Sequence, residues 1–403
     1  MAVTLDDILA AQQRIAGGVY FSPCPESQQL SPLCDARVYC KLEYLQRTGS
    51  FKERGARNAL LLLDAEQRRR GVITASAGNH ALGLAYHGRL LSVAVTVVMP
   101  KHAPLIKVAT CRNLGAEVVL HGETYAEALA QAESLAAQRS LRFIHGFNDE
   151  AIIAGQGTLG LEVLAQVRDV EAIVVPVGGG GLIAGVSLAV KSLRPDVKII
   201  GVEAVHTPNF SEALNAGHPV SYASRPTLAD GLAVGRAGDI PFEIARSRID
   251  RLVQVSEDDL CTAVLRLVEL EKSVVEGAGA APLAACLGGR VVELVGKRVV
   301  LLLAGGNIDP TMLSRVIEHA LVTDGRLCRF TATISDRPGG LARLAQVVAS
   351  TGASVKQVEH DRAFSGADLT AVNVLCTVET LGPAHIEEVF ARLAENGISI
   401  VSR

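Results

Sequence analysis

Lys52 is the residue whose position in this sequence most clearly suggests chemistry. It follows a Thr-Gly-Ser turn at residues 48–50 and precedes a helical run predicted over residues 54–63. The positive end of a helix dipole disfavours a charged amine at this place. A neutral lysine amine can attack a carbonyl group, and lysine loses its proton more easily when it is desolvated or lies near positive charge. Solvated surface lysines are more common, so the segment alone does not decide between the two interpretations.

Four consecutive glycines, Gly178, Gly179, Gly180 and Gly181, follow an apolar run that ends at Val177. Glycines leave backbone N–H groups open to close approach, and such groups at the start of a helix bind anions. The spacing matches neither a nucleoside-triphosphate loop nor a dinucleotide fingerprint. A tight strand-to-helix turn is the alternative, but a turn needs fewer glycines, and each costs up to about 1 kcal/mol of ordering. The run therefore favours phosphate binding.

Two further turns carry small polar residues. Residues 74–80 read Thr-Ala-Ser-Ala-Gly-Asn-His, and Ser76, Asn79 and nearby N–H groups could bind a carboxylate or a phenolic oxygen. Ser and Asn are also favoured as helix N-caps, which leaves both interpretations open. His80 by itself is more typical of a packed or capping histidine than of a base. The glycine-rich turn at residues 303–309 alone predicts only a helix entry.

These turns follow short apolar runs that alternate with helical patterns. Continuous Val, Ile and Leu runs separated by helices predict parallel strands buried on both faces, and hence an α/β fold. The predicted strands cover residues 71–74, 93–99, 117–120, 172–177, 198–202 and 298–303. The carboxyl ends of such strands meet at one edge, where ligands bind. A reactive lysine, a phosphate cradle and two polar turns at that edge fit pyridoxal 5′-phosphate, which joins an aldehyde and a phosphate through a ring.

Composition narrows the class of protein. The chain has 403 residues, 49% of them hydrophobic, and a net charge of −3. The length predicts two or three domains with a large core, and the nearly balanced charge argues against nucleic-acid binding and a membrane-surface role. Eight cysteines without a Cys-x-x-Cys pair indicate reduced thiols. No signal peptide and no bilayer-spanning stretch is indicated, so we expect a cytoplasmic protein.

The pattern changes after residue 322. A polar turn at 323–326 precedes a predicted strand at 329–334, a helix from Gly340, strands near 353–361 and 369–379, a helix near 383–396 and a strand at 398–401. Apolar residues at helical spacing mark the first of these helices. The βαββαβ order, in about 75 residues, predicts a small ferredoxin-like module.

Together these motifs resemble those of the fold-type II pyridoxal-phosphate enzymes, and among them the threonine dehydratases (threonine ammonia-lyases) with a C-terminal ACT domain. The resemblance covers essentially the whole chain. It implies a two-subdomain catalytic domain like that of the tryptophan synthase β chain. The implied bounds are 1–322 for the catalytic domain, about 53–147 for its small subdomain, 323–327 for a linker and 328–403 for an ACT regulatory domain.

The resemblance also implies roles for residues. In the segment 50–56, which is similar to the family's Schiff-base motif, Lys52 matches the cofactor lysine and Phe51 a residue that packs on the cofactor ring. Asn79 matches the residue bonded to the phenolic oxygen of the cofactor, and the four glycines match the phosphate loop. The implied substrate-carboxylate loop consists of Ser76, Ala77, Gly78, Asn79 and His80. The implied effector loop of the ACT domain contains Asp336, Pro338 and Gly339.

Some positions depart from the pattern of the family and its relatives. Ala304 stands where the family usually has a Ser or Cys that faces the pyridine nitrogen. Ala77 stands where related racemases carry a second serine, which acts as a base on the opposite face. The segment from Glu203 to Asn209 does not reproduce the carboxylates of metal-binding relatives, so we expect no metal site.

The resemblance implies deamination of L-threonine to 2-oxobutanoate and ammonia, with L-serine to pyruvate as a second reaction. Lys52 would hold the cofactor and remove the α-proton of the substrate. The implied partners are an amino-acid substrate, an amino-acid effector at the ACT domain and further copies of the chain, in a homodimer or homotetramer. A hydroxyaspartate lyase, a serine racemase-like enzyme and a non-catalytic amino-acid sensor remain alternatives.

Overall fold

The computed structural model describes residues 3–361 and 370–402. The chain divides into two compact units, Met1–Asp309 and Pro310–Arg403. Residues 1, 2, 362–369 and 403, which belong to the predicted catalytic and regulatory domains, lie outside the described residues. The domain bounds drawn from the sequence stay a prediction.

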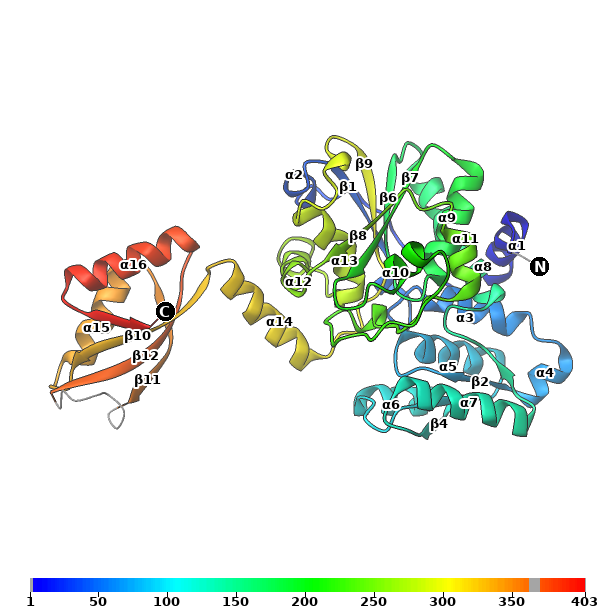
Figure 1. Ribbon diagram of the computed structural model, residues 1–403, viewed down its shortest axis with the longest axis horizontal. Coiled ribbons are helices and arrows are strands. Elements are labelled where there is room, and N and C mark those ends of the chain that lie inside the picture. Colours follow the sequence, from blue (N-terminus) through cyan, green and yellow to red (C-terminus); the bar gives the residue numbers. More distant parts are fainter. Residues whose placement is uncertain (1–2, 362–369, 403) are drawn as a thin grey trace. The chain divides into compact units, whose positions relative to one another are not determined.

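The first unit contains a large sheet whose five strands are all parallel, in the order β1-β9-β6-β7-β8. The strands are β1 (Arg37–Leu42), β6 (Ala172–Pro176), β7 (Lys198–Ala204), β8 (Arg251–Val255) and β9 (Arg298–Leu303). One layer of helices consists of α1 (Leu5–Ile15), α8 (Glu150–Gln166), α9 (Gly181–Leu193) and α11 (Asp239–Ala245); the other consists of α12 (Glu257–Glu271) and α13 (Gly277–Leu287) (Figure 1). The sheet is buried on both faces, as continuous apolar strands require.

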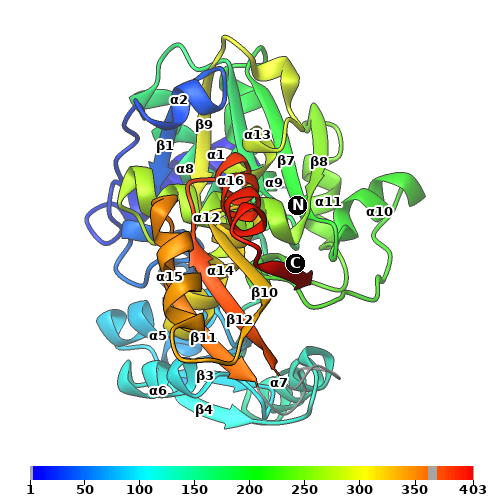
Figure 2. The ribbon, with the colours of Figure 1, turned by 90° about the vertical axis from the view of Figure 1, so that its left-hand side faces the viewer.

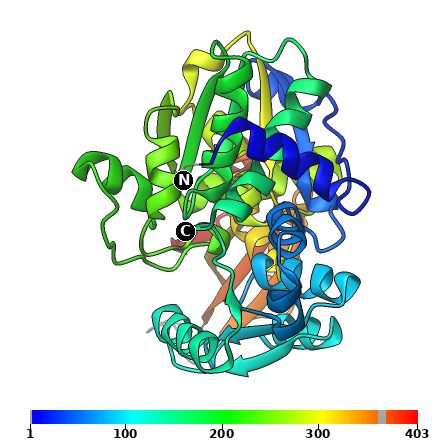
Figure 3. The same ribbon diagram turned by 90° about the vertical axis from the view of Figure 1, so that its right-hand side faces the viewer.

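A smaller parallel sheet in the same unit has the order β4-β3-β2-β5. It consists of β2 (Val72–Ala75), β3 (Val95–Met99), β4 (Glu117–Leu120) and β5 (Arg142–Phe143) (Figure 3). Alternate residues of β2 and β3 join two separate cores, one with α3 (Lys52–Leu61), α5 (Asn79–Leu91) and α6 (Leu105–Asn113), the other with α7 (Tyr125–Arg139). The predicted α/β class with parallel sheets is therefore confirmed.

The second unit begins with α14 (Pro310–Thr323) and continues in the predicted βαββαβ order. The elements are β10 (Leu327–Ser335), α15 (Gly340–Ser350), β11 (Ser354–Asp361), β12 (Ala371–Glu379), α16 (Pro383–Glu395) and β13 (Ser399–Ser402). The antiparallel sheet has the order β11-β12-β10-β13, and α15 and α16 pack on it (Figure 2). Alternation along β10, with Phe330, Ala332 and Ile334 buried, leaves the other face of the strand more polar.

Three strands, β1, β5 and β8, were not predicted from the sequence, and the structure shows why. Strand β1 contains Lys41, which looks polar in the sequence but is buried in an ion pair with Glu162. Strand β8 lies at the sheet edge and alternates polar with apolar residues, and β5 has only two residues. The remaining short elements are α2 (Leu30–Leu33), η1 (Glu43–Leu45), α4 (Ala65–Arg70), α10 (Asn209–Ala216), η2 (Asp230–Leu232) and η3 (Val292–Leu294). None of the helices within the described ranges has the length and apolarity to cross a membrane.

Candidate active site

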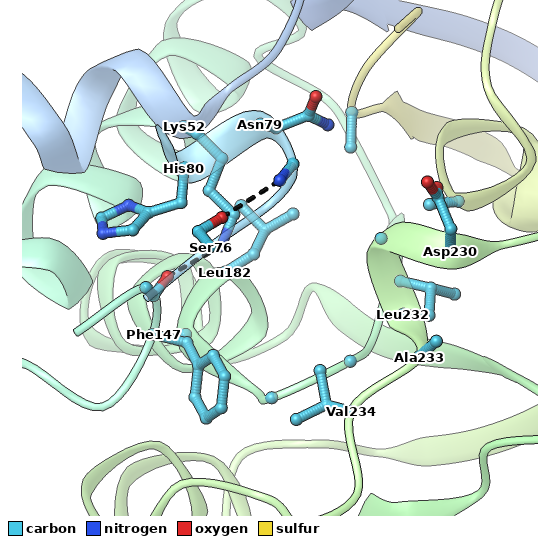
Figure 4. Close-up of a pocket in the computed structure, with 18 of the residues that line it drawn as sticks. Lys52, Ser76, Asn79, His80, Phe147, Leu182, Asp230, Leu232, Ala233 and Val234 are labelled. Atoms are coloured by element: carbon cyan, nitrogen blue, oxygen red, sulfur yellow. Dashed lines mark hydrogen bonds between the residues drawn. The ribbon is translucent and has the colours of Figure 1, made fainter. Parts of the chain in front are cut away.

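A cavity of about 360 Å³ lies between the two sheets of the first unit. That volume is within the range of small-molecule sites. Figure 4 shows Lys52, Ser76, Asn79 and His80 on one side of the cavity. Across from them lie Asp230, Leu232, Ala233 and Val234. The four-glycine turn and Ala304 also line it. The structure thus brings together every residue that the sequence predicted for a cofactor and substrate site.

Lys52 is the first residue of α3, and its amine points into this cavity. The turn before it is held to the end of β9, because Phe51 donates its N–H to the backbone oxygen of Ala304 at 3.0 Å. Nζ of Lys52 donates to the backbone oxygen of Gly146 at 2.7 Å, and it lies 5.2 Å from the Phe51 ring centroid. Burial lowers the pKa of Lys52 to about 8, although the negative charge of Glu276 opposes the shift.

The four glycines join β6 to α9 and leave no room for side chains. A Cβ on Gly179 would lie 2.4 Å from the ring of Phe147, and a Cβ on Gly181 would lie 3.0 Å from backbone and side-chain atoms of the same residue. Gly180 has φ +91°, in the left-handed region that favours glycine. The turn therefore presents backbone N–H groups at the start of a 13-residue helix, which suits a phosphate group.

Hydrogen bonds, one within the turn and one to a distant segment, hold the polar groups of the turn between β2 and α5 in place. Oγ of Ser76 accepts the N–H of Gly78 at 3.2 Å. Nδ2 of Asn79, the first residue of α5, donates to Glu276 at 2.7 Å. His80 is packed beneath the turn with Nε2 3.3 Å from the backbone oxygen of Ile144, and burial, aided by the Lys52 charge, lowers the pKa of His80 to about 3. A neutral, packed His80 agrees with the structural interpretation of this residue.

Ala304 follows β9 and is almost fully buried beside the cavity. A side chain at the adjacent Gly305 would have to displace the carboxyl of Glu276, since its Cβ would lie 2.4 Å from Oε1. Glu276 precedes α13, and burial raises the pKa of its carboxyl to about 7. A lysine amine, a glycine cradle and a polar turn around one cavity fit the aldehyde, phosphate and ring of pyridoxal 5′-phosphate.

The sequence did not single out several residues that line the cavity. They are chiefly Phe147, whose ring covers Gly179, the segment 230–234, and Glu276. Lys107, at the start of α6, forms an ion pair with Asp230 at 3.0 Å across the cavity mouth. These residues come from loops and helix starts without a pattern of their own. Glu276 alone could have been found from the sequence, as an acidic residue that directly precedes the run of small residues Gly277–Ala281.

Two predicted features lie elsewhere. Asp336, Pro338 and Gly339 belong to the second unit, in an exposed loop between β10 and α15. Glu203 is buried, and its carboxylate accepts the N–H groups of Phe210 and Ser211 at 2.7 and 3.0 Å. In the described part of the chain, no three His, Cys, Asp or Glu side chains gather as they would to hold a metal ion.

Comparison with known proteins places these features in a family. The model of the pyridoxal-phosphate dependent enzymes matches residues 15–305. The chain is 42% identical over 398 residues to an L-threonine ammonia-lyase of Thermotoga maritima, covering 99% of each protein. Among solved structures, the processed form of threonine deaminase isoform 2 from Solanum lycopersicum is similar with a TM-score of 0.74 and 38% identity, over 78% of this chain and 92% of that one. Maize serine racemase is similar with a TM-score of 0.75 and 31% identity, over 80% and 99%.

Proposed function

This chain belongs to the family of pyridoxal-phosphate dependent enzymes, and from that premise we propose that it deaminates L-threonine to 2-oxobutanoate and ammonia. Its cofactor is pyridoxal 5′-phosphate, and it is an ammonia-lyase. The full-length similarity to an L-threonine ammonia-lyase supports threonine as the substrate. The observation that carries the proposal is the shared cavity of the Lys52 amine and the four-glycine turn.

In this proposal Lys52 anchors the cofactor and later serves as the base. When bound, the cofactor supplies an aldehyde and a ring that accepts the electron pair left by removal of a proton. The freed amine of Lys52 takes the α-proton of the substrate, a task that requires the neutral form. Because its pKa is lowered to about 8, a much larger fraction of Lys52 is neutral near neutral pH than of a lysine with the ordinary pKa.

The other cavity residues bind the cofactor and the substrate and orient them. We assign the phosphate to the N–H groups of Gly178–Gly181, and the cofactor ring to the neighbourhood of Phe51. Asn79 donates to the phenolic oxygen of the cofactor. Ser76 and the neighbouring N–H groups of residues 76–80 bind the substrate carboxylate, because N–H groups at a helix start favour an anion. The hydrogen bonds that hold Ser76 and Asn79 in place at the cavity support these roles.

Lys107 bears on the choice of substrate. A hydroxyaspartate lyase needs a cation for the second carboxylate, and Lys107 is a cation at the cavity mouth. Its charge is already matched by Asp230 at 3.0 Å, so a second carboxylate would have to displace that partner. We therefore favour an uncharged β-hydroxy side chain, that of threonine or, as a second substrate, serine.

Racemisation of serine is the main alternative to deamination, since maize serine racemase has a similar fold. Ala77 has no acid or base group that could return a proton to the second face of a substrate. We therefore expect the unmodified protein to interconvert L- and D-serine slowly compared with deamination. Chiral analysis of serine during turnover checks this, and rapid interconversion would overturn it.

Turnover measurements test the proposal. The protein loaded with pyridoxal 5′-phosphate should release 2-oxobutanoate from L-threonine and pyruvate from L-serine, with little product from hydroxyaspartate. Lys52→Ala should abolish release by removing anchor and base. Lys198→Ala, which changes an exposed lysine paired with Asp250, should leave it unchanged. Normal turnover by Lys52→Ala, or no 2-oxo acid from any of the three amino acids, would sink the proposal and, in the second case, favour the sensor alternative.

We further propose that the second unit is an ACT domain that binds an amino-acid effector through the loop of Asp336, Pro338 and Gly339. Its βαββαβ order and the exposure of this loop support the assignment. The family model ends at residue 305, before this unit begins. A homodimer or homotetramer in the cytoplasm completes the proposal. The eight cysteines, none of them in a disulfide, suit a reducing compartment, and light scattering tests the oligomer.

A further inference from the structure

Asn307, in the turn after β9, uses both N–H groups of its side-chain amide. Nδ2 of Asn307 donates to the backbone oxygen of Thr48 at 2.7 Å and to Oδ1 of Asn79 at 2.8 Å. Thr48 opens the turn that leads to Lys52, and Asn79 begins α5. Since both partners are acceptors, the side-chain amide of Asn307 can have only one orientation.

That orientation determines the orientation of the Asn79 amide as well. Oδ1 of Asn79 faces Asn307, so Nδ2 of Asn79 points the other way and donates to Oε1 of Glu276 at 2.7 Å. The backbone N–H of Asn307 also hydrogen-bonds to the Glu276 carboxyl, which holds this acceptor in place. One N–H of Asn79 is left to donate to a ligand in the cavity that Asn79 lines.

The neighbouring turns are built closely around Asn307. Gly49 has φ +77°, and a Cβ there would lie 2.5 Å from Oδ1 of Asn307, so the turn before Lys52 has no room for a side chain. Gly306 donates its N–H to the backbone oxygen of Gly49 at 2.9 Å. The hydrogen bonds of Asn307 thus connect the lysine turn, the Asn79 turn and the start of α13.

We propose that Asn307, together with Glu276, is a positioning residue that fixes the Asn79 amide with an N–H, rather than its oxygen, toward the phenolic oxygen of the cofactor. The inference rests on the proposed function, in which Asn79 binds that oxygen. An N–H donor stabilises an ionised phenolic oxygen, whereas an amide oxygen in the same place would repel it. Asn307 acts through Asn79 and does not itself need to touch the cofactor.

The substitution Asn307→Asp tests this with almost no change in shape. An ionised aspartate only accepts hydrogen bonds, so it loses the contact to Thr48 and draws the N–H groups of Asn79 toward itself. We expect the dissociation constant for pyridoxal 5′-phosphate, titrated into cofactor-free protein, to rise about 10- to 100-fold, and the visible band of the bound cofactor to shift. Asn215→Asp, the same change at an exposed helix end, should alter neither quantity.

A double-substitution cycle separates positioning from a general structural role. In an Asn79→Ala background, Asn307→Asp should change the dissociation constant less than about threefold, because the group through which it acts is gone. If the two effects multiply instead, Asn307 does not act through Asn79 and the inference is overturned. Should Asn307→Asp fail to fold by circular dichroism, Asn307→Ser removes the same contacts without a charge, and the same cycle decides.

Failure of this inference differs from failure of the proposed function. If the unmodified protein binds the cofactor and turns over threonine, while Asn307→Asp has the same dissociation constant and visible band, only the positioning role is wrong. If the unmodified protein acquires no visible band on addition of pyridoxal 5′-phosphate, the proposed function fails, and the positioning role fails with it.

Discussion

At the scale of single residues, the site depends on a lysine whose pKa is lowered by burial. Burial lowers the pKa of Lys52 from 10.5 to about 8. The neutral fraction of this amine therefore increases as the pH rises through about 8, well below the range of a solvated lysine. Glu276 works against this, because its negative charge favours the ammonium form.

The first prediction concerns loading of the cofactor. The rate at which cofactor-free protein takes up pyridoxal 5′-phosphate, followed by visible absorbance, should increase with pH and level off above about 8, because only the neutral amine attacks an aldehyde. Glu276→Gln should move the midpoint to lower pH, and Lys198→Ala should leave it in place. A rate that keeps rising toward pH 10.5 would mean that Lys52 has an ordinary pKa.

A second prediction at this scale concerns Ala304, which offers no hydrogen bond to the pyridine nitrogen. Elimination of a β-hydroxyl needs only a moderate electron sink, so we expect the natural alanine to be compatible with activity. Ala304→Ser should change kcat for threonine by roughly a factor of two to twelve, the value of one neutral hydrogen bond of about 0.5–1.5 kcal/mol. A gain of several thousand-fold would indicate a disabled natural site and would favour a sensor over an enzyme.

At the scale of elements, the glycine turn between β6 and α9 is limited by what packs against it. Gly180 requires its left-handed backbone, whereas Gly179 is limited by the ring of Phe147, 2.4 Å from where a Cβ would lie. A side chain there must displace the ring, and the ring covers the wall of the cavity. The loop that carries Phe147 also carries Gly146, the hydrogen-bond partner of Lys52.

The third prediction follows from this packing. Gly179→Ala should raise the dissociation constant for pyridoxal 5′-phosphate at least about tenfold and destabilise the protein by roughly 1–3 kcal/mol, the usual cost of overpacking. Gly235→Ala is the matched control, since its Cβ would meet its nearest neighbour at an ordinary 3.4 Å. Cofactor titration and urea unfolding measure the two effects. Equal behaviour of the two variants would show that Phe147 yields without cost.

At the scale of the whole molecule, the cavity residues all belong to the first unit, while the proposed effector loop belongs to the second. Binding at the second unit can then alter turnover only through a coupling free energy between two sites. Such coupling is typically about 1–3 kcal/mol, which changes half-saturation by roughly 5- to 150-fold.

The fourth prediction separates the βαββαβ part of the second unit from the rest of the chain by function. A chain that ends at Thr323 should keep threonine turnover and lose any response to branched-chain or other amino acids. In the intact chain, Asp336→Ala should weaken the same response while leaving basal turnover unchanged. Steady-state kinetics with and without each amino acid measure both. An unchanged response in the truncated, still folded chain would place the regulatory site within residues 1–323.

The fold was predictable where local chemistry decides it. Strand β9, an apolar run that is almost wholly buried, and the short edge strand β4 both have the bounds predicted from the sequence. The pattern of the last 75 residues or so indicated the βαββαβ order. Strand β1 was missed because Lys41 looks polar until Glu162 neutralises it from helix α8. Such a pairing joins residues far apart in the chain, so no local pattern reveals it.

The chemistry of the site was predictable from the sequence, because a lysine at a helix start and four glycines after a strand have few other uses in combination. The pKa of the Lys52 amine and the orientation of the Asn79 amide, in contrast, depend on the tertiary structure. Burial and the charge of Glu276 establish the pKa of Lys52, and Asn307 orients Asn79. These effects depend on desolvation and hydrogen-bond direction between segments more than 200 residues apart in sequence, such as Asn79 and Asn307 (228 residues).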